Sequence, residues 1–469
     1  MKRFGYAQER LKRNLQVTFF LSRISRGVPR RVVPILVVFG LAPLTSIAQS
    51  DCEIPVIHEH EALIRSALDC NGAQQALDAR WRSQQYRTEA TGRLDDPKLM
   101  LGLAPQTFGD ERLDEGYIVE LSQPLPWPGV LSLRKRASAA LTDVWQARLQ
   151  QGHVNLAKQI RLAYAQWQYH RQLQAINERH QALWQEFIAV VRAKYASGTS
   201  TKSAVLQATH EHHFLQQEAI ELKAMIERDI SELKRLGNLH TQTRIDIANN
   251  ALPLSQLAPE YWHTLLASLD QQPLMKGLAA ERQQKAYELS LAEKDRYPTF
   301  NVMARYNSLW MNDEQRWVIG VGFNLPFDLG KRQSREDSVR AEQMALRWQQ
   351  QDLRVQLREM LMQTHSHWQQ AKDVSALYQK DLLPLSRENL TTARDEYQSG
   401  SGDFLSLLTA QRQLLSTERK AQQALRDQFA QFAQLLAAAG IVFEHELPDS
   451  PERNKVNSPE ETDEGNPHD

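Results

Sequence analysis

The sequence predicts a mainly helical protein that carries a small β part and consists of two similar halves. Three features lead to this fold class. Long stretches rich in Gln, Ala, Leu and Arg have helical character, two pairs of short runs alternate apolar and polar residues, and one motif occurs twice, half a chain apart. Because this period is far longer than the roughly 20–50 residues of a solenoid repeat, we interpret it as an internal duplication.

The duplicated motif begins with Tyr, continues through Ser-Gly and ends with Leu and Ala. The first copy runs from Tyr195-Ala-Ser-Gly198-Thr-Ser200 to Leu206-Gln-Ala208, and the second from Tyr397-Gln-Ser-Gly400-Ser-Gly402 to Leu408-Thr-Ala410. Glycine tolerates the left-handed backbone at which one helix ends and another begins. A helix C-cap alone would explain one such motif. Two copies in register predict two helical hairpins with tips near 198 and 400.

Composition excludes some classes of function. The chain has 469 residues and equal numbers of acidic and basic residues, so no net charge favours nucleic acid as a partner. A mean hydropathy of -0.53 excludes a bundle of membrane-spanning helices. It does not exclude a membrane β-barrel, because barrel strands give only a weak hydropathy signal.

The first 48 residues are typical of a signal peptide. A long basic region precedes the apolar run 32–41, which is too short to span a membrane, and Ser46-Ile-Ala48 offers small residues for cleavage after Ala48. The length of the basic region leaves open a true start downstream of Met1. The two cysteines, Cys52 and Cys70, are able to pair in an oxidising compartment, but their spacing does not decide it. The residues before Cys52 do not favour lipidation.

The first half, 49–250, begins with a helical pattern over 59–92 that Asp96-Pro97 stops. The runs 98–103 and 117–123 then predict an antiparallel strand pair within 98–123. Helical patterns follow over 131–196 and 203–236. The first of these is about 95 Å long at 1.5 Å per residue, which exceeds any ordinary globular helix and predicts a coiled-coil-like assembly.

The second half, 251–447, repeats this order. It has a helix over 259–295, a strand pair within 299–325, a helical pattern over 333–397 and a last helix that ends at Gly440. Pro384 predicts a kink. A heptad seam is expected on the third of these segments, at Leu346, Leu353, Met360 and the neighbouring Leu357 and Leu361. The acidic, Pro-containing segment 448–469 predicts a disordered tail.

The two faces of the strands decide between water and lipid. One polar row, predicted to face a lumen, comprises Lys98, Glu120, Asn301 and Arg305. The opposite rows contain no charge: Leu99, Leu101, Leu103; Tyr117, Val119, Leu121; Phe300, Val302, Ala304, Tyr306; Trp317, Ile319, Val321, Phe323. A charge facing lipid costs roughly 2–4 kcal/mol, so these rows favour a membrane barrel over a soluble two-sheet core. A barrel needs about eight strands, so this chain must associate with copies of itself.

The two Tyr-x-x-Gly tips and the strand pairs that end in Leu-Pro resemble the TolC family of outer-membrane efflux channels over nearly the whole mature chain. The resemblance implies a homotrimer with a twelve-stranded barrel in outer-membrane lipid and a long periplasmic helical tunnel. It also implies a Gram-negative bacterium, a periplasmic adaptor (membrane fusion) protein and an inner-membrane pump. The segment from Asp96-Pro97 to Trp127-Pro128-Gly129 is similar to the heavy-metal branch, which serves resistance-nodulation-division exporters.

The resemblance also suggests where the channel closes. In well-known family members, acids near the second tip narrow the periplasmic mouth; here those positions are Ser406 and Thr409, and their first-half equivalents are Ala204 and Gln207. Asp403 is the nearest acid, which we expect in the gate unless it only favours the helix N-terminus. The expected tip and adaptor-docking residues are Tyr195, Gly198, Ser200, Tyr397, Gly400 and Gly402.

No enzyme motif occurs, and we expect no catalytic residue, no cofactor and no resident metal. His210, His212 and His213 cluster beyond the first tip, but they are interpreted as solvated helix residues. The sequence therefore predicts a passive exit duct, with heavy-metal cations as cargo. Two alternatives stay open: a channel for drugs or for a type I secreted polypeptide, and, in another class, a periplasmic coiled-coil scaffold protein.

Overall fold

The computed structural model describes residues 56–57, 60–108, 115–240, 242–245, 259–310 and 315–444. The chain divides into 1–51 and 52–469, and every described element belongs to the second unit. The predicted signal peptide, Cys52 and the predicted tail lie outside the described residues. Cys70 is disulfide-bonded, and the sequence contains one other cysteine. Among the described residues, no helix combines the length and apolar character needed to cross a membrane.

The main elements among the described residues of the first half are two shorter helices, one pair of strands and two long helices. Helices α2 (His60–Cys70) and α3 (Gly72–Thr91) lead to strands β2 (Lys98–Ala104) and β3 (Gly116–Leu125), with the short helix η1 (Pro105–Thr107) between them. Helix α4 (Val130–Ala196) follows and turns into α5 (Lys202–Gly237). Both strands and both long helices lie within two residues of their predicted limits.

The second half has the same order of elements. Helix α6 (Pro259–Ala267), η2 (Leu269–Gln271) and α7 (Pro273–Lys294) precede strands β5 (Phe300–Asn307) and β6 (Trp317–Phe323). The long helical segment that follows comprises α8 (Leu329–Leu377), the π-helical turn η4 (Tyr378–Leu382) and α9 (Leu383–Ser399). Helix α10 (Phe404–Ala438) completes the second hairpin.

The four strands form one antiparallel sheet in the order β2-β3-β5-β6. Its register places Leu101 opposite Val119, Val119 opposite Tyr306, and Tyr306 opposite Trp317, so the predicted apolar rows share one face. The outer strands β2 and β6 each have a strand neighbour on one side only. A short parallel pair, β1 (Val56–Ile57) with β4 (Arg244–Ile245), was not predicted.

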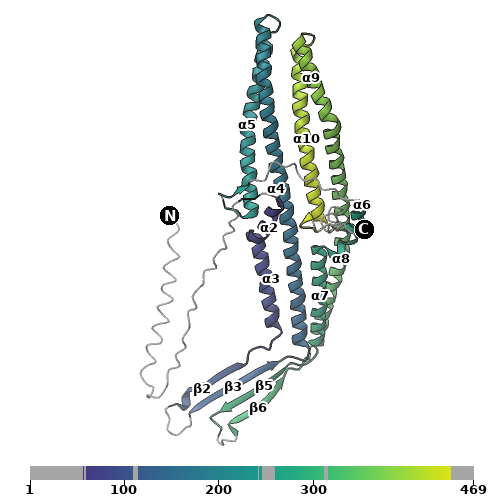
Figure 1. Cartoon of the computed structure of the whole chain (residues 1–469). Helices are drawn as coiled ribbons and strands as arrows, with labels where there is room; N and C mark the ends of the chain where they lie inside the picture. The colour runs from purple at the N-terminus through teal and green to yellow at the C-terminus, as the bar shows by residue number, and fades with distance from the viewer. Residues whose placement is uncertain are drawn as a thin grey trace, which may run out of the picture. The chain divides into compact units, whose positions relative to one another are not determined.

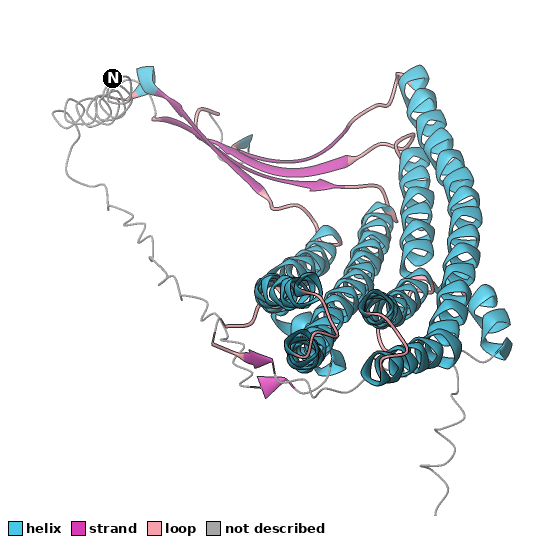
Figure 2. Ribbon diagram, turned by 90° about the horizontal axis from the view of Figure 1, so that it is seen from above, coloured by secondary structure: helices cyan, strands magenta, loops and turns pink. Residues whose placement is uncertain are grey.

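Figure 1 shows the sheet at one end of this unit and both hairpin tips at the other. Helix α4 runs between these ends and packs against α3 and α7 near the sheet, and against α5 and α10 nearer the tips. Seen from above, the sheet is twisted, and loops join its strands to the helices (Figure 2). The helical part is held by three apolar clusters, of which the one nearest the tips concerns function most.

Two predicted helices were wrong in length because local groups interrupt them. The predicted helix 59–92 is two helices, since the Asn71 side chain accepts hydrogen bonds from the N–H groups of Ala73 and Gln74 and starts α3 anew. The predicted helix 259–295 is also divided. Pro273 occupies the first turn of α7, where its missing N–H costs nothing.

Two details of the long segment 329–399 also differ from prediction. Pro384 is preceded by the π-helical turn η4, which accommodates the proline ring and was not predicted, and the kink expected there stays a prediction. The predicted seam residues Leu346, Leu357 and Leu361 are buried on α8, whereas Met360 is 49% exposed. Leu346, Leu357 and the buried Trp368 are spaced by eleven residues. An eleven-residue spacing follows a nearly straight helix better than seven does.

Candidate functional site: the hairpin tips and the sheet

The first tip joins α4 to α5 through a left-handed glycine. Gly198 has φ +76°, and the N–H of Thr199 donates to the carbonyl of Lys194 at 2.8 Å, which satisfies one of the last carbonyls of α4. Thr201 then caps α5, because its hydroxyl accepts a hydrogen bond from the N–H of Ala204 at 3.2 Å. The tip is therefore a built turn with both helix ends satisfied.

The second tip repeats this turn with other side chains. Gly400 has φ +87°, and the N–H of Gly402 donates to the carbonyl of Glu396 at 2.9 Å. Asp403 caps α10, since its Oδ1 accepts from the N–H of Ser406 at 2.8 Å. Hydrogen bonds from the side chain of Ser406 and, second, from its backbone N–H lower the pKa of Asp403 below its usual value because they favour the ionised carboxylate. Asp403 therefore occupies the N-terminus of α10, which was the alternative to a place in the gate, and its expected role in the gate stays a prediction.

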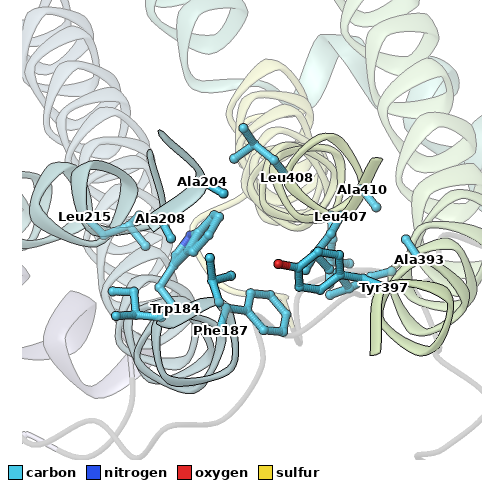
Figure 3. Packing of buried hydrophobic residues seen from close by; sticks show 14 residues of the cluster. Trp184, Phe187, Ala204, Ala208, Leu215, Ala393, Tyr397, Leu407, Leu408 and Ala410 are labelled. Atoms are coloured by element: carbon cyan, nitrogen blue, oxygen red, sulfur yellow. The ribbon is translucent and has the colours of Figure 1, made fainter. Parts of the chain in front are cut away.

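A shared apolar cluster, the tip core, joins the two hairpins just behind these turns (Figure 3). Trp184 and Phe187 of α4 meet at right angles, with ring centroids 5.7 Å apart. The other buried members come from α4, α5, α9 and α10: Ile188, Val191, Ala204, Ala208, Leu215, Leu390, Ala393, Tyr397, Leu407, Leu408, Ala410 and Leu414. Of the Leu and Ala that recur in the duplicated motif, Ala208, Leu408 and Ala410 are buried in the tip core, whereas Leu206 is 60% exposed.

The two equivalent tyrosines have different surroundings. Tyr397 is 5% exposed and its ring lies against Phe404, whereas Tyr195 is 47% exposed. Lys194 of the first hairpin donates to the carbonyl of Tyr397 at 2.6 Å and lies over its ring at 4.8 Å. Ser200 lies 3.3 Å from the Tyr397 hydroxyl. Through these contacts with Lys194 and Ser200, Tyr397 holds the second tip against the first.

Ion pairs continue this link along α5 and α10. Arg412 pairs with Glu211, and seven residues further Arg419 pairs with Glu218. Deeper in the protein, His180 of α4 lies 3.0 Å from a carboxylate oxygen of Glu418. Sequence reasoning missed these pairs. The partners in each α5–α10 pair are separated by 201 residues, nearly the spacing of the duplicated motif, but this spacing does not show which side chains of the two helices meet.

The structure separates the predicted gate residues. Ala204 is buried in the tip core, whereas Gln207, Asp403, Ser406 and Thr409 are exposed. Of the other predicted tip residues, Gly198, Gly400 and Gly402 form the turns themselves. Their role in docking or gating stays a prediction.

The sheet separates charge from apolar surface. On its polar face, Arg305 and Glu120 stand opposite each other in register and form an ion pair at 2.5 Å. Lys98 and Asn301 belong to the same face by register. The other face is apolar and exposed in the single chain, with Leu101, Ile319 and Val321 more than 60% accessible. Exposing so large an apolar face of one sheet to water is energetically unfavourable.

The prediction that the histidines beyond the first tip are solvated is wrong for His212, because α5 turns this side chain inward. His212 is buried, whereas His210 and His213 are exposed, and His213 bonds to Gln216 at 2.9 Å. Within the described ranges, no group of three or more His, Cys, Asp or Glu side chains is arranged to hold a metal ion.

Comparison with known proteins supports this architecture. Residues 265–441 match the family model described as outer membrane efflux protein. No curated protein sequence matches the chain.

Several solved structures match most of the chain. The outer-membrane channel OprN has a TM-score of 0.68 at 18% identity and covers 81% of this chain and 89% of its own. CusC, described in connection with transmembrane channel formation, has a TM-score of 0.69 at 16% identity. The match covers 81% of this chain and 92% of CusC. MtrE of Neisseria gonorrhoeae, an outer-membrane channel in its open state, has a TM-score of 0.69 at 17% identity. The match covers 83% of this chain and 91% of MtrE. The chain therefore has the fold of these channels.

Proposed function

We propose that this protein is the outer-membrane channel of a tripartite efflux system and acts as a passive exit duct. The observation that carries the proposal is the sheet, whose charge-free apolar face is exposed and lies at the end opposite the two tips. Lipid is the surrounding that makes such a face stable. The match of residues 265–441 to the outer membrane efflux protein model supports the same assignment.

A homotrimer would complete the barrel. Strands β2 and β6 each leave one edge unpaired, and three copies of a four-stranded sheet would join these edges into twelve strands. Helix α8 offers a second contact, because Met344, Trp348, Val355 and Met362 form an exposed stripe with helical spacing. Crosslinking through cysteines placed on β2 and β6 should give a covalent trimer in membranes.

The two ends of the protein would then have different tasks. The polar face with Lys98, Glu120, Asn301 and Arg305 would line the lumen of the barrel. The tips would dock a periplasmic adaptor and, through it, an inner-membrane resistance-nodulation-division pump. Asp403, Ser406, Thr409 and Gln207 are exposed at the tips and would surround the periplasmic opening. Ala204 would act there only through the tip core that it helps to pack.

Heavy-metal cations are the proposed cargo, on the basis of the segment from Asp96 to Gly129. The test is growth of a deletion strain on copper, silver, zinc, cobalt and cadmium, beside a panel of drugs and detergents. Sensitivity to metals alone would support this cargo. Sensitivity to drugs alone, or loss of a secreted polypeptide, would retain the channel and overturn the metal assignment.

A periplasmic scaffold is the competing class, because the hairpins alone would suit a coiled-coil protein. Outer-membrane fractionation and heat-modifiable migration separate the two. A channel should require detergent for release and should migrate differently after boiling. Release by osmotic shock without detergent would overturn the channel.

A further inference from the structure

A cavity of about 270 Å³ lies where the sheet meets the helices. Its walls come from the end of β3, the start of α4, the end of α7 and the start of α8, so four segments far apart in the sequence build it. Five of its lining side chains are cationic: Arg134, Lys294, Lys331, Arg332 and Arg335. Asp295 is the only acidic side chain among the described residues that line it.

Most of this positive charge is not neutralised by the protein. Asp295 pairs with Arg335 at 2.5 Å. Arg332 is instead held by two backbone carbonyls, those of Asp295 and Asp328, each at 2.7 Å, which fix the guanidinium without removing its charge. Arg134 and Lys331 make no side-chain hydrogen bond or ion pair with any residue that the structure describes. An anion entering the cavity would therefore meet a strong positive potential.

The backbone at the cavity adds to this preference. Helix α4 begins at the cavity, and its N-cap is Gly129, which provides no side-chain cap. The first N–H groups of a helix carry partial positive charge and bind anionic oxygens well. Elsewhere in the lining, the Oδ1 atom of Asn324 accepts two hydrogen bonds from Thr299, and its amide NH₂ group remains as a further donor.

Aromatic side chains place the cavity beside the apolar face of the sheet. The ring of Trp127, which lines the cavity, stacks on Tyr297 at 4.7 Å and on Phe300 at 5.8 Å. Phe300 belongs to the apolar face, opposite Phe323 in register. Phe323, which precedes the lining residue Asn324 in the chain, is 60% exposed, and Phe327 is 83% exposed. An aromatic cluster between apolar surface and cations is the arrangement found where a protein crosses a membrane–water boundary.

We infer that this cavity binds the phosphate headgroup of an anionic phospholipid at the membrane edge of the sheet. The inference rests on the proposed function, because it requires the apolar face to lie in lipid. The headgroup phosphate would enter among Arg134, Lys331 and Arg332, and the acyl chains would run along the exposed apolar side chains near Phe327. Basic pockets at membrane boundaries recognise anionic headgroups in this way.

The test is native mass spectrometry of the full-length protein in detergent, titrated with phosphatidylglycerol or phosphatidylcholine. Wild type should bind one phosphatidylglycerol per chain in preference to phosphatidylcholine. The double variant Arg134→Ala/Lys331→Ala should bind phosphatidylglycerol on the order of thirtyfold more weakly. The matched control is Lys135→Ala/Arg136→Ala, which removes two exposed cations from the same turn of α4 but none from the cavity. Its affinity should stay within about twofold of wild type.

Three results would overturn the inference. One is no preference for phosphatidylglycerol in wild type, and another is equal weakening in both double variants, which would indicate diffuse attraction. The third is displacement of the lipid by millimolar inorganic phosphate, which would assign the cavity to the free ion. Fractionation of wild type is read separately. If the protein is absent from the outer membrane, the proposed function fails whatever lipid binds in detergent.

Discussion

The two hairpin tips have the same turn but different neighbours. Gly198 and Gly400 adopt the same left-handed conformation, and Thr201 and Asp403 cap the following helix at equivalent positions. Yet Tyr195 is half exposed, whereas Tyr397 is buried against Lys194 and Phe404. The duplicated motif therefore specifies a turn. The packing of one hairpin on the other gives Tyr397 a further role, which is to hold the two tips together.

The largest expected difference between the tips is the loss of the buried tyrosine. Tyr397→Ala removes a ring from the tip core and should destabilise the joined tips by roughly 3–5 kcal/mol, the range for truncating a buried aromatic side chain. Tyr195→Ala, the matched control, should change stability by less than about 0.5 kcal/mol because the ring is largely in water. Hydrogen exchange of the tip amides, read with denaturant unfolding, measures both. Equal losses of stability in Tyr397→Ala and Tyr195→Ala would contradict the role of Tyr397 in holding the two tips together.

The turns themselves should respond alike. Gly198→Val and Gly400→Val each force a β-branched residue into the left-handed region, which should cost about 1–2 kcal/mol or more. The added Cβ would meet no atom within 4 Å at either position, so backbone strain alone sets the cost. Asn at the same positions should be tolerated better, since it visits this region.

Thermal unfolding of the four variants, with an export assay, checks this prediction. Gly400→Val should also reduce export, because a disturbed tip docks the adaptor poorly. Unchanged export by Gly400→Val would contradict the assignment of the tips to docking. A large difference in cost between the two Val variants would show that the turns are not equivalent.

The smallest expected effect is a pH dependence confined to the second tip. The pKa of Asp403 is lowered in the folded protein, so its stabilisation of α10 is present above its unfolded pKa of about 3.9 and disappears as the pH falls through the lower folded value. Asp403→Ala should therefore speed amide exchange in the first turn of α10 at pH 7, and this difference from wild type should vanish in acid. Thr201→Ala should affect α5 equally at every pH, since a hydroxyl does not titrate in this range. If the effect of Thr201→Ala on amide exchange in α5 also depended on pH, the proposed difference between the two caps would be wrong.

Local features of this protein could be predicted from the sequence alone. Alternating side chains predicted both strand pairs and their apolar face, because successive residues of a strand point to opposite sides. Gly198, Gly400 and Gly440 predicted helix ends, because their conformation is unfavourable for other residues. Asn71 and Pro273 also act locally, because each marks the start of a new helix. Had these start signals been used, the two helices predicted as continuous would each have been predicted as two.

Long-range contacts were decided only in the tertiary structure. Nothing in the motif distinguishes Tyr195 from Tyr397, and the pairing of Glu211 with Arg412 depends on the rotation of α5 relative to α10. The cavity at Arg134, Lys331 and Arg332 likewise exists because the starts of two helices meet at the end of one sheet. A backbone conformation depends on a few neighbouring residues, whereas burial and charge pairing depend on which surfaces the whole chain brings into contact.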